Sequence, residues 1–304
     1  MWALLFLVLA VYFLDRFALS PRSFDGLEYQ HYVTKYLVEP DEEFYLVSSI
    51  KNNSLLFIPY LKINIQGADT SSLYMLPRRS AVRNIPISLP KRGRYQFPRA
   101  EIVRGDFLGM RENFKKFDTN CEVIVYPKAI ENERIIKEFA DYIGDIIVRR
   151  FIMEDPVLTA GFAEYTGREP MKAISWKQSA RAGRMMVKTY DYSAELNVSV
   201  VLDCNGTADE VENSLSIART ICQMLERKRV RYDFYSNMVT VGSMIKWDYV
   251  PEGLGSAHLN FILEGMGRAG HYAKESSGQL LARARGGREM ILISPNGGLN
   301  GGLK

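Results

Sequence analysis

The stretch that decides the fold runs from Leu196 to Val230 and reads LNVSVVLDCNGTADEVENSLSIARTICQMLERKRV. It begins with an almost continuous apolar run, LNVSVVLD, which is typical of a strand buried on both faces of a sheet. Apolar residues then recur every three to four positions, at Val211, Leu215, Ala218, Cys222 and Leu225. This spacing predicts an amphipathic helix from about Ala208 to Arg227, so strand and helix together form the unit of an α/β domain.

The chain beyond this stretch continues the alternation of strands and helices. Arg231 to Tyr235 and the run MILIS from Met290 to Ser294 predict strands, and the pattern within Leu259 to Arg285 predicts a further helical stretch. Because strands that alternate with helices usually pair in parallel, this order predicts an open, mainly parallel α/β sheet.

The region before Leu196 begins with a different period. From about Leu27 to Tyr126, short runs of alternating, β-branched or aromatic residues are separated by turn residues. The runs are EFYLVSSIKN, YLKINIQ, AVRNIPISL, GRYQFPRAEIV and CEVIVYP. Strands at this spacing predict a β-sandwich at residues 22–128. We interpret it as a structural spacer in preference to a carbohydrate-binding or protein-binding sandwich.

A helical period separates the two regions. Apolar residues recur every three to four positions between Ile135 and Ile147, which predicts an amphipathic connecting helix within residues 129–160. The expected fold is therefore α+β and multidomain. It has an anchor at 1–19, the sandwich at 22–128, the connecting helix, and an α/β domain at 161–304 that starts with a basic segment.

The first residues, MWALLFLVLAVYFL, form an uninterrupted apolar run. They give a helix of about 21 Å against a hydrocarbon core of about 30 Å, so the predicted transmembrane span extends to residue 19 with Asp15 and Arg16 snorkelling. No positive charge precedes the run, so a single-pass anchor in the cell membrane is favoured over a signal peptide and over a buried helix. Because Arg16, Arg22 and Lys35 follow it, the positive-inside rule places the bulk of the chain in the cytoplasm.

Composition and motifs exclude several function classes. A net charge of +4 over 304 residues is too small for a protein that binds polyanions with its whole surface. Cys121, Cys204 and Cys222 lack the paired spacing of a zinc site. The sequence has no phosphate-binding loop, HExxH or GxSxG motif, and a GxGxxG match at residues 265–270 lies too near the end for a dinucleotide fold. We therefore expect a protein without catalytic activity.

The loop after LNVSVVLD is the first candidate site, because ligands of open α/β sheets gather at the carboxyl ends of strands. Asp203, Asn205 and Thr207 place oxygen-bearing side chains at alternate positions, and Mg²⁺ prefers oxygen ligands. The spacing resembles the DxSxS adhesion motif of von Willebrand factor A domains, so these residues are predicted to bind Mg²⁺ or another divalent cation. In the structural alternative, Asp203 ends a strand and Thr207 is the N-cap of the next helix.

The second candidate site is the basic segment from Gly161 to Lys188, GFAEYTGREPMKAISWKQSARAGRMMVK, which places six cations around Tyr165 and Trp176. Three interpretations stay open: stacking and phosphate contact with single-stranded nucleic acid, contact with anionic lipid, or a docking clamp with Ile174 and Trp176 packed inward. Trp is more often part of a core than of a ligand platform. The docking clamp is therefore favoured, and nucleic acid is the less favoured partner.

The basic segment resembles the signature Y-x-x-G-D-x-x-R-x-I-[DN]-W-K-x-[ST]-A-R of the bacterial family known as domain of unknown function 58. The residues taken as its docking surface are Tyr165, Lys172, Ile174, Trp176, Lys177, Ser179, Arg181 and Lys188. The resemblance extends to a hydrophobic N-terminal segment, a β-rich region that ends at 125–127, and a strand that ends at Asp203. Ser175 stands where the family has Asp or Asn, and a docking role tolerates this change better than catalysis would.

The resemblance implies a von Willebrand factor A-like α/β domain and an accessory role. Members of the family commonly occur beside MoxR-type AAA+ ATPases, and other membrane proteins of the same operon are further expected partners. We therefore expect a membrane-anchored, non-catalytic adaptor that works with a MoxR-type AAA+ ATPase in a chaperone-like assembly. Binding of nucleic acid or anionic lipid through residues 161–188 is the alternative function.

Overall fold

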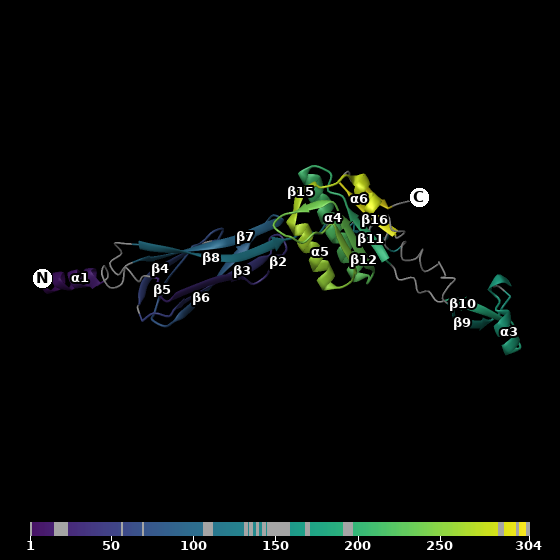
Figure 1. Ribbon diagram of the computed structural model, residues 1–304, viewed down its shortest axis with the longest axis horizontal. Coiled ribbons are helices and arrows are strands. Elements are labelled where there is room, and N and C mark those ends of the chain that lie inside the picture. Colours follow the sequence, from purple (N-terminus) through teal and green to yellow (C-terminus); the bar gives the residue numbers. More distant parts are fainter. Residues whose placement is uncertain are drawn as a thin grey trace. The chain divides into compact units, whose positions relative to one another are not determined.

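The computed structural model describes residues 2–14, 24–55, 57–68, 70–105, 112–130, 133, 136–137, 140–141, 144, 159–167, 171–190, 197–284, 289–295 and 298–301. The chain divides into two compact units (Figure 1). The first unit comprises Met1–Lys128 and Leu263–Ala269, and the second comprises Ala129–Ile262 and Gly270–Lys304.

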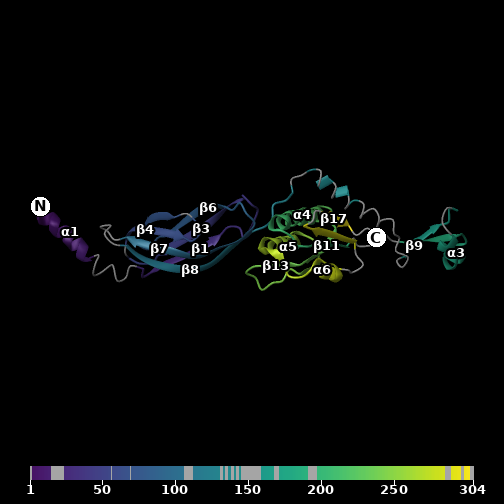
Figure 2. The same cartoon turned by 90° about the horizontal axis from the view of Figure 1, so that it is seen from above.

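Two β-sheets make up the body of the first unit (Figure 2). Its strands are β1 (Leu27–Val33), β2 (Leu37–Val38), β3 (Glu43–Asn52), β4 (Ile58–Ile65), β5 (Ser71–Met75), β6 (Ser80–Ser88), β7 (Gly93–Gly105) and β8 (Glu112–Val125). The order β1-β3-β6 forms an antiparallel sheet. The order β2-β8-β7-β4-β5 forms the other, in which β2 and β8 pair in parallel and the remaining pairs are antiparallel.

The two sheets share one hydrophobic core. Phe44 and Leu46 of β3 belong to the same buried cluster as Leu61 and Ile63 of β4 and Ile102 of β7. These residues alternate with more exposed ones along their strands, as a strand with one core-facing side requires. Burial of each Leu, Ile or Phe side chain contributes about 1.5–3 kcal/mol, so the side chains buried between the two sheets hold them together.

The first unit also contains a helix end from far along the chain. The segment Leu263–Ala269 includes the end of helix α5 (Ser256–Arg268). The Arg92 guanidinium donates to the carbonyls of Met266 at 2.8 Å and Ala269 at 2.6 Å, so a cation closes the carbonyl end of the helix. Glycine at position 267 lets the end of the helix lie against β8, because a Cβ there would lie 2.4 Å from Cγ2 of Ile124.

The predicted transmembrane anchor at residues 1–19 is wrong for the part of the chain that the structure describes. Helix α1 (Trp2–Leu14) has 13 residues, which span about 20 Å. Residues 15–23 lie outside the described ranges, and no described helix is long and apolar enough to cross a membrane. A hydrocarbon core of about 30 Å needs about 20 apolar residues. The described structure therefore does not support the predicted single-pass anchor in the cell membrane.

The second unit is built on a sheet with the order β14-β12-β11-β16-β17. The strands of this unit are β9 (Thr159–Glu164), β10 (Met186–Tyr190), β11 (Asn197–Leu202), β12 (Arg231–Ser236), β13 (Met238–Thr240), β14 (Tyr249–Gly253), β15 (Ala269–Ala273), β16 (Glu289–Ser294) and β17 (Gly298–Gly301). Its other helices are η3 (Met171–Ala173), α3 (Trp176–Ala182), α4 (Ala208–Arg227) and α6 (Ser277–Ala284). The elements β11, α4, β12 and β16 form where the hydrophobic pattern predicted them.

Strand β11 is the central strand of this sheet. It pairs in parallel with β12 on one side and with β16 on the other. Val200 and Val201 point to opposite faces, and both are fully buried. Val201 belongs to a cluster with Leu280 and Ala284 of α6, while α4 also contacts β11, so helices cover the strand as its continuous apolar run predicted.

The prediction of a mainly parallel sheet is wrong, because the sheet is mixed. Strand β14 pairs with β12 in antiparallel orientation, and β17 does the same with β16. Both partners follow without an intervening helix, and a chain that returns by a short connection can pair only antiparallel. The strands predicted at Arg231–Tyr235 and Met290–Ser294 pair in parallel with the central strand, but the two return strands at the edges were not predicted.

Most of residues 129–160 lies outside the described residues, so the amphipathic connecting helix stays a prediction. The basic segment that follows folds locally. Strands β9 and β10 form an antiparallel pair, and η3 and α3 lie between them in the sequence. An isolated antiparallel β-bridge between Ile174 and Val187 joins this connection to β10.

Candidate functional site

Asp203 lies directly after β11, at the carboxyl end of the central strand, and only 4% of its surface is exposed. Its Oδ1 accepts hydrogen bonds from the backbone N of Asn205 at 3.0 Å, from Nδ2 of Asn205 at 2.8 Å and from Nδ2 of Asn237 at 2.7 Å. The sequence analysis missed Asn237. The signal was its place directly after β12, since Leu202 and Ser236 are in register and their successors meet at one edge.

The remaining partners of the two amides determine their orientation. Oδ1 of Asn237 accepts from the backbone N of Cys204 at 2.8 Å, so its Nδ2 must face Asp203. Nδ2 of Asn205 and Nδ2 of Asn237 each donate to the carbonyl oxygen of Glu275 at 3.2 Å. A carbonyl only accepts hydrogen bonds, so both amide nitrogens face this group. We call Asp203, Asn205, Asn237 and Glu275 the carboxyl-end cluster.

The predicted cation ligands do not fit a hard cation in this arrangement. Three N–H groups surround Oδ1 of Asp203, where Mg²⁺ would need oxygen atoms. Thr207 is the N-cap residue of α4, and its N–H and its hydroxyl both donate to the Glu210 carboxylate at 2.8 Å. These bonds lower the pKa of Glu210. Within the described ranges, no group of three or more His, Cys, Asp or Glu side chains is placed to hold a metal ion.

An exposed apolar loop follows β13 and leads back to β14. The large exposed side chains of this loop are Val241, Met244 and Ile245, with Met244 fully exposed, and the exposed Tyr249 follows them as the first residue of β14. Trp247 fixes the base of the loop: it is 1% exposed, its Nε1 donates to the Phe261 carbonyl at 2.8 Å, and its carbonyl accepts from Ser236 Oγ at 2.7 Å. Because Ser236 ends β12, the loop base lies at the carboxyl edge of the sheet. We call Val241, Met244, Ile245 and Tyr249 the apolar loop.

The signature residues Ile174 and Ser179 have structural roles in the basic segment. Ile174 is buried against Val187 of β10. The Ser179 hydroxyl donates to the Ser175 carbonyl at 2.9 Å and accepts from the backbone N of Met186 at 2.8 Å, which joins α3 to β10. Tyr165 is half-buried and its backbone N donates to the Met185 carbonyl at 2.9 Å. These contacts give the segment a small core of its own.

Trp176 does not pack inward, contrary to the expectation that it anchors the segment with Ile174. It is the first residue of α3, and 63% of its surface is exposed. Lys172, Lys177, Arg181 and Lys188 are also exposed, and the ion pairs found among the described residues leave all four out. The described ion pair of the segment joins Arg184 to Glu164 at 3.1 Å. The segment therefore exposes an aromatic ring and four cations.

A buried ionic cluster in the first unit had no signal in the sequence. The Arg268 side chain is 4% exposed and donates to Glu122 at 2.5 Å, to Glu264 at 3.0 Å and to the Tyr36 hydroxyl at 2.5 Å. Arg94 reaches the other carboxylate oxygen of Glu122 at 2.7 Å. Burial acts to raise the pKa of Glu122, but the hydrogen bonds from Arg268 and Arg94 outweigh it and lower that pKa. Burial and the bond to Glu264 raise the pKa of Tyr36 to about 12.

The known proteins to which this chain is similar are distant from it in sequence and structure. No protein-family model matches the chain. The uncharacterized protein YeaD of Bacillus subtilis (strain 168) is 23% identical over 144 residues, which are 47% of this chain and 36% of YeaD. The chain therefore spans little more than a third of the length of this curated relative.

Among solved structures, the CARDB domain of the PF1109 protein from Pyrococcus furiosus is 16% identical, and the match covers 32% of this chain and 96% of that domain with a TM-score of 0.22. Spo0M, a sporulation control protein from Bacillus subtilis, is 12% identical, with 43% of this chain and 58% of Spo0M covered at a TM-score of 0.22. Likeness at these scores carries no argument about function.

Proposed function

We propose that this protein is a non-catalytic interaction protein whose second unit docks a partner protein through the apolar loop. The observation that carries the proposal is the fully exposed Met244 beside Ile245 on a loop fixed at its base by the buried Trp247. A loop fixed at its base loses less backbone freedom on binding than an unanchored loop, and its apolar side chains gain by leaving water. Exposed apolar patches of this kind mark protein–protein contacts.

The family resemblance of the basic segment supports the choice of partner. A MoxR-type AAA+ ATPase is the partner that this resemblance implies, and the protein would act as its adaptor in a chaperone-like assembly. The carboxyl-end cluster adds a rigid edge beside the loop, because its carboxylate and amides hold the ends of β11 and β12 together. Docking on such an edge requires no bound cation.

The test is capture of a purified MoxR-type AAA+ ATPase by the full chain. We expect the double change Met244→Ser and Ile245→Ser to weaken capture about tenfold or more, since each buried apolar side chain contributes about 1.5–3 kcal/mol. The matched control is Leu55→Ser, which alters an exposed apolar residue of the first unit. Equal capture by the double variant and the control would refute docking through the apolar loop, and absence of any capture would refute the ATPase as partner.

A second candidate function is binding of a polyanion by the basic segment, and the exposure of Trp176 favours it. The exposed ring is open to stacking, and among the described residues Lys172, Lys177 and Arg181 of the same segment are exposed and outside the ion pairs. Single-stranded nucleic acid would use both features.

We expect Trp176→Ala to weaken binding of a labelled oligo-dT by the stacking energy of one base, about 1–3 kcal/mol. Fluorescence anisotropy at several salt concentrations measures this, and affinity should fall steeply as salt rises. Binding to phosphatidylserine vesicles, measured at the same salt concentrations, tests whether the segment binds anionic lipid instead. A flat salt response with both probes would exclude polyanion binding, and Leu55→Ser again serves as control.

A further inference from the structure

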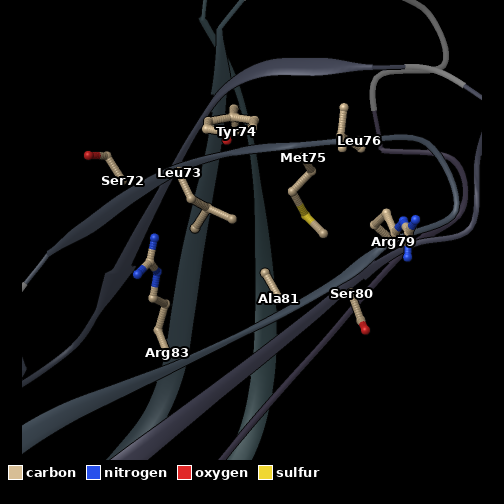
Figure 3. A pocket seen from close by; sticks show the side chains of 9 residues that line it. All are labelled: Ser72, Leu73, Tyr74, Met75, Leu76, Arg79, Ser80, Ala81 and Arg83. Carbon is tan, nitrogen blue, oxygen red and sulfur yellow. The ribbon is translucent and has the colours of Figure 1, made fainter.

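The first unit has an open corner where the chain crosses from one sheet to the other. Among the described strands, β5 is an edge strand of one sheet and β6 is an edge strand of the other. The turn Leu76–Arg79 joins β5 to β6. A groove of about 480 Å³ lies between these two outer strands (Figure 3). Its volume is within the range of known ligand sites.

The groove combines an apolar floor with polar and basic walls. Leu73 and Met75 of β5 and Ala81 of β6 supply the apolar lining, and Figure 3 shows their side chains directed into the space between the strands. Tyr74, 67% exposed, alternates with them and points to the other face of β5. An apolar side chain inserted from outside would therefore meet a preformed recess.

The turn at the end of the groove is held by hydrogen bonds to the end of β3 and the residues after it. Asn52 Nδ2 donates to the Leu76 carbonyl at 3.2 Å, and Asn52 N donates to the Arg79 carbonyl at 2.9 Å. The backbone N of Arg78 donates to the Ser54 carbonyl at 3.2 Å. These bonds fix the separation of β5 and β6 where they diverge, so the groove is organised before any ligand arrives.

The charge around the groove has one sign. Within the described residues, its lining contains two Arg residues and no Lys, Asp or Glu. Arg79 and Arg83 line the groove and are exposed, and the ion pairs of the described residues include neither. Guanidinium groups bind carboxylates by two parallel hydrogen bonds, so the groove is complementary to an acidic ligand.

Strand β6 also has an edge whose backbone N–H and C=O groups face no other described strand. It pairs with β3 along Ser80–Ser88, and within the described residues its other side has no strand beside it. An unpaired edge is a template for an added strand. Pro86 has no N–H, which limits an added strand to the Ser80–Ile85 half of β6, and this half is the one that borders the groove.

We propose that this corner binds an extended acidic segment of a partner protein, added as a strand along Ser80–Ile85. Of the side chains on its groove face, the apolar one enters the groove against Leu73 and Ala81, and the carboxylates two positions before and after it meet Arg79 and Arg83, which lie on the same face as Ala81. A nucleic acid or an acidic polysaccharide would satisfy the charge, but it lacks both the strand backbone and the apolar side chains. The site is separate from the apolar loop of the second unit and does not depend on it.

The experiment titrates the full chain against a labelled, capped peptide with Glu-Thr-Val-Thr-Glu at its centre, so that Glu, Val and Glu share one face, and follows binding by fluorescence anisotropy. We expect saturable binding that the double change Arg79→Ala and Arg83→Ala weakens about tenfold or more, because two charge-assisted contacts are lost. Ala81→Glu should abolish binding by placing a carboxylate in the groove. The matched control is Arg99→Ala, which removes an exposed Arg of β7 outside the groove and should leave affinity within about twofold.

Two further peptides test strand addition and charge. Replacing the central Val by Pro removes a backbone N–H and should weaken binding about tenfold, and replacing Glu by Lys should eliminate it. Equal binding of the Pro peptide, or an equal loss with Arg99→Ala, would overturn the proposal. Displacement by heparin or oligo-dT with no effect of Ala81→Glu would show a general polyanion surface instead. None of these outcomes bears on capture of the ATPase.

Discussion

Replacing Arg268 by Met should destabilise the first unit by about 2–4 kcal/mol. Removal of one partner of a buried ion pair usually costs about 3–5 kcal/mol, because the remaining charge stays buried without compensation. We expect a smaller effect here, since the Glu122 and Glu264 side chains keep 23% and 21% of their surface exposed. Urea unfolding of the full chain measures the loss.

The control for Arg268 is Arg99, which pairs with Asp118 at 2.9 Å while both side chains are exposed. Arg99→Met should cost no more than about 1 kcal/mol, because exposed pairs contribute little. Equal destabilisation by the two changes would contradict the role that we assign to the buried ionic cluster.

The same cluster predicts a dependence of stability on pH. The folded-state pKa of Glu122 is below its ordinary value of 4.5, so the unfolded chain binds a proton more readily than the folded one. The stability that the carboxylate contributes is therefore present above pH 4.5 and is lost as the pH falls through the folded-state value. Arg268→Met should reduce this loss, because the largest hydrogen bond that lowers the pKa is then gone.

Replacing Asp203 by Ala should destabilise the second unit by about 2–4 kcal/mol. The Asn237 donor is buried, and a buried donor that loses its bond to Oδ1 of Asp203 costs about 1–3 kcal/mol, while the two bonds from the exposed Asn205 add about 0.5–1.5 kcal/mol together. Asn205 and Asn237 keep their bonds to the Glu275 carbonyl, which limits the total. Thermal unfolding should show a lower Tm, by about 2–4 °C for each kcal/mol.

Magnesium separates the structural role of Asp203 from a metal-binding role. A cation that binds only the folded chain raises its stability with concentration. We expect the Tm of the unaltered chain to stay the same with millimolar MgCl₂ and with EDTA. Thr207→Ala serves as a comparison, because it removes an N-cap and should cost about 1 kcal/mol whether or not a cation is present. A Tm that rises with Mg²⁺ in the unaltered chain and not in Asp203→Ala would restore the metal site.

Several elements of the fold were predictable from local sequence. The stripe from Val211 to Leu225 defined α4, and the continuous run of β11 predicted burial on both faces. Thr207 followed by Glu210 was readable as a helix start, which was the structural alternative to cation binding. Each of these signals lies within a few residues of the element that it predicts.

Other features had no local signal. Asn237 reaches Asp203 because β12 pairs with β11, and Arg268 reaches Glu122 across 146 positions of the chain. Trp176 was expected inside the basic segment, yet Ile174 and Val187 fill its small core and leave the ring exposed. The length of α1 corrected the expected membrane anchor, and the return strands β14 and β17 corrected the expected parallel sheet.

The amino-acid sequence by itself determined the central elements of the second unit, such as β11 and α4, because hydrophobic period and capping act between neighbours in the chain. It also pointed to the family resemblance on which the choice of ATPase partner rests, and this partner stays a proposal. Only the tertiary structure decided which polar groups meet. The Asp203 carboxylate faces three N–H donors because strand register and amide orientation, set in part by residues far apart in the chain, place those donors around it.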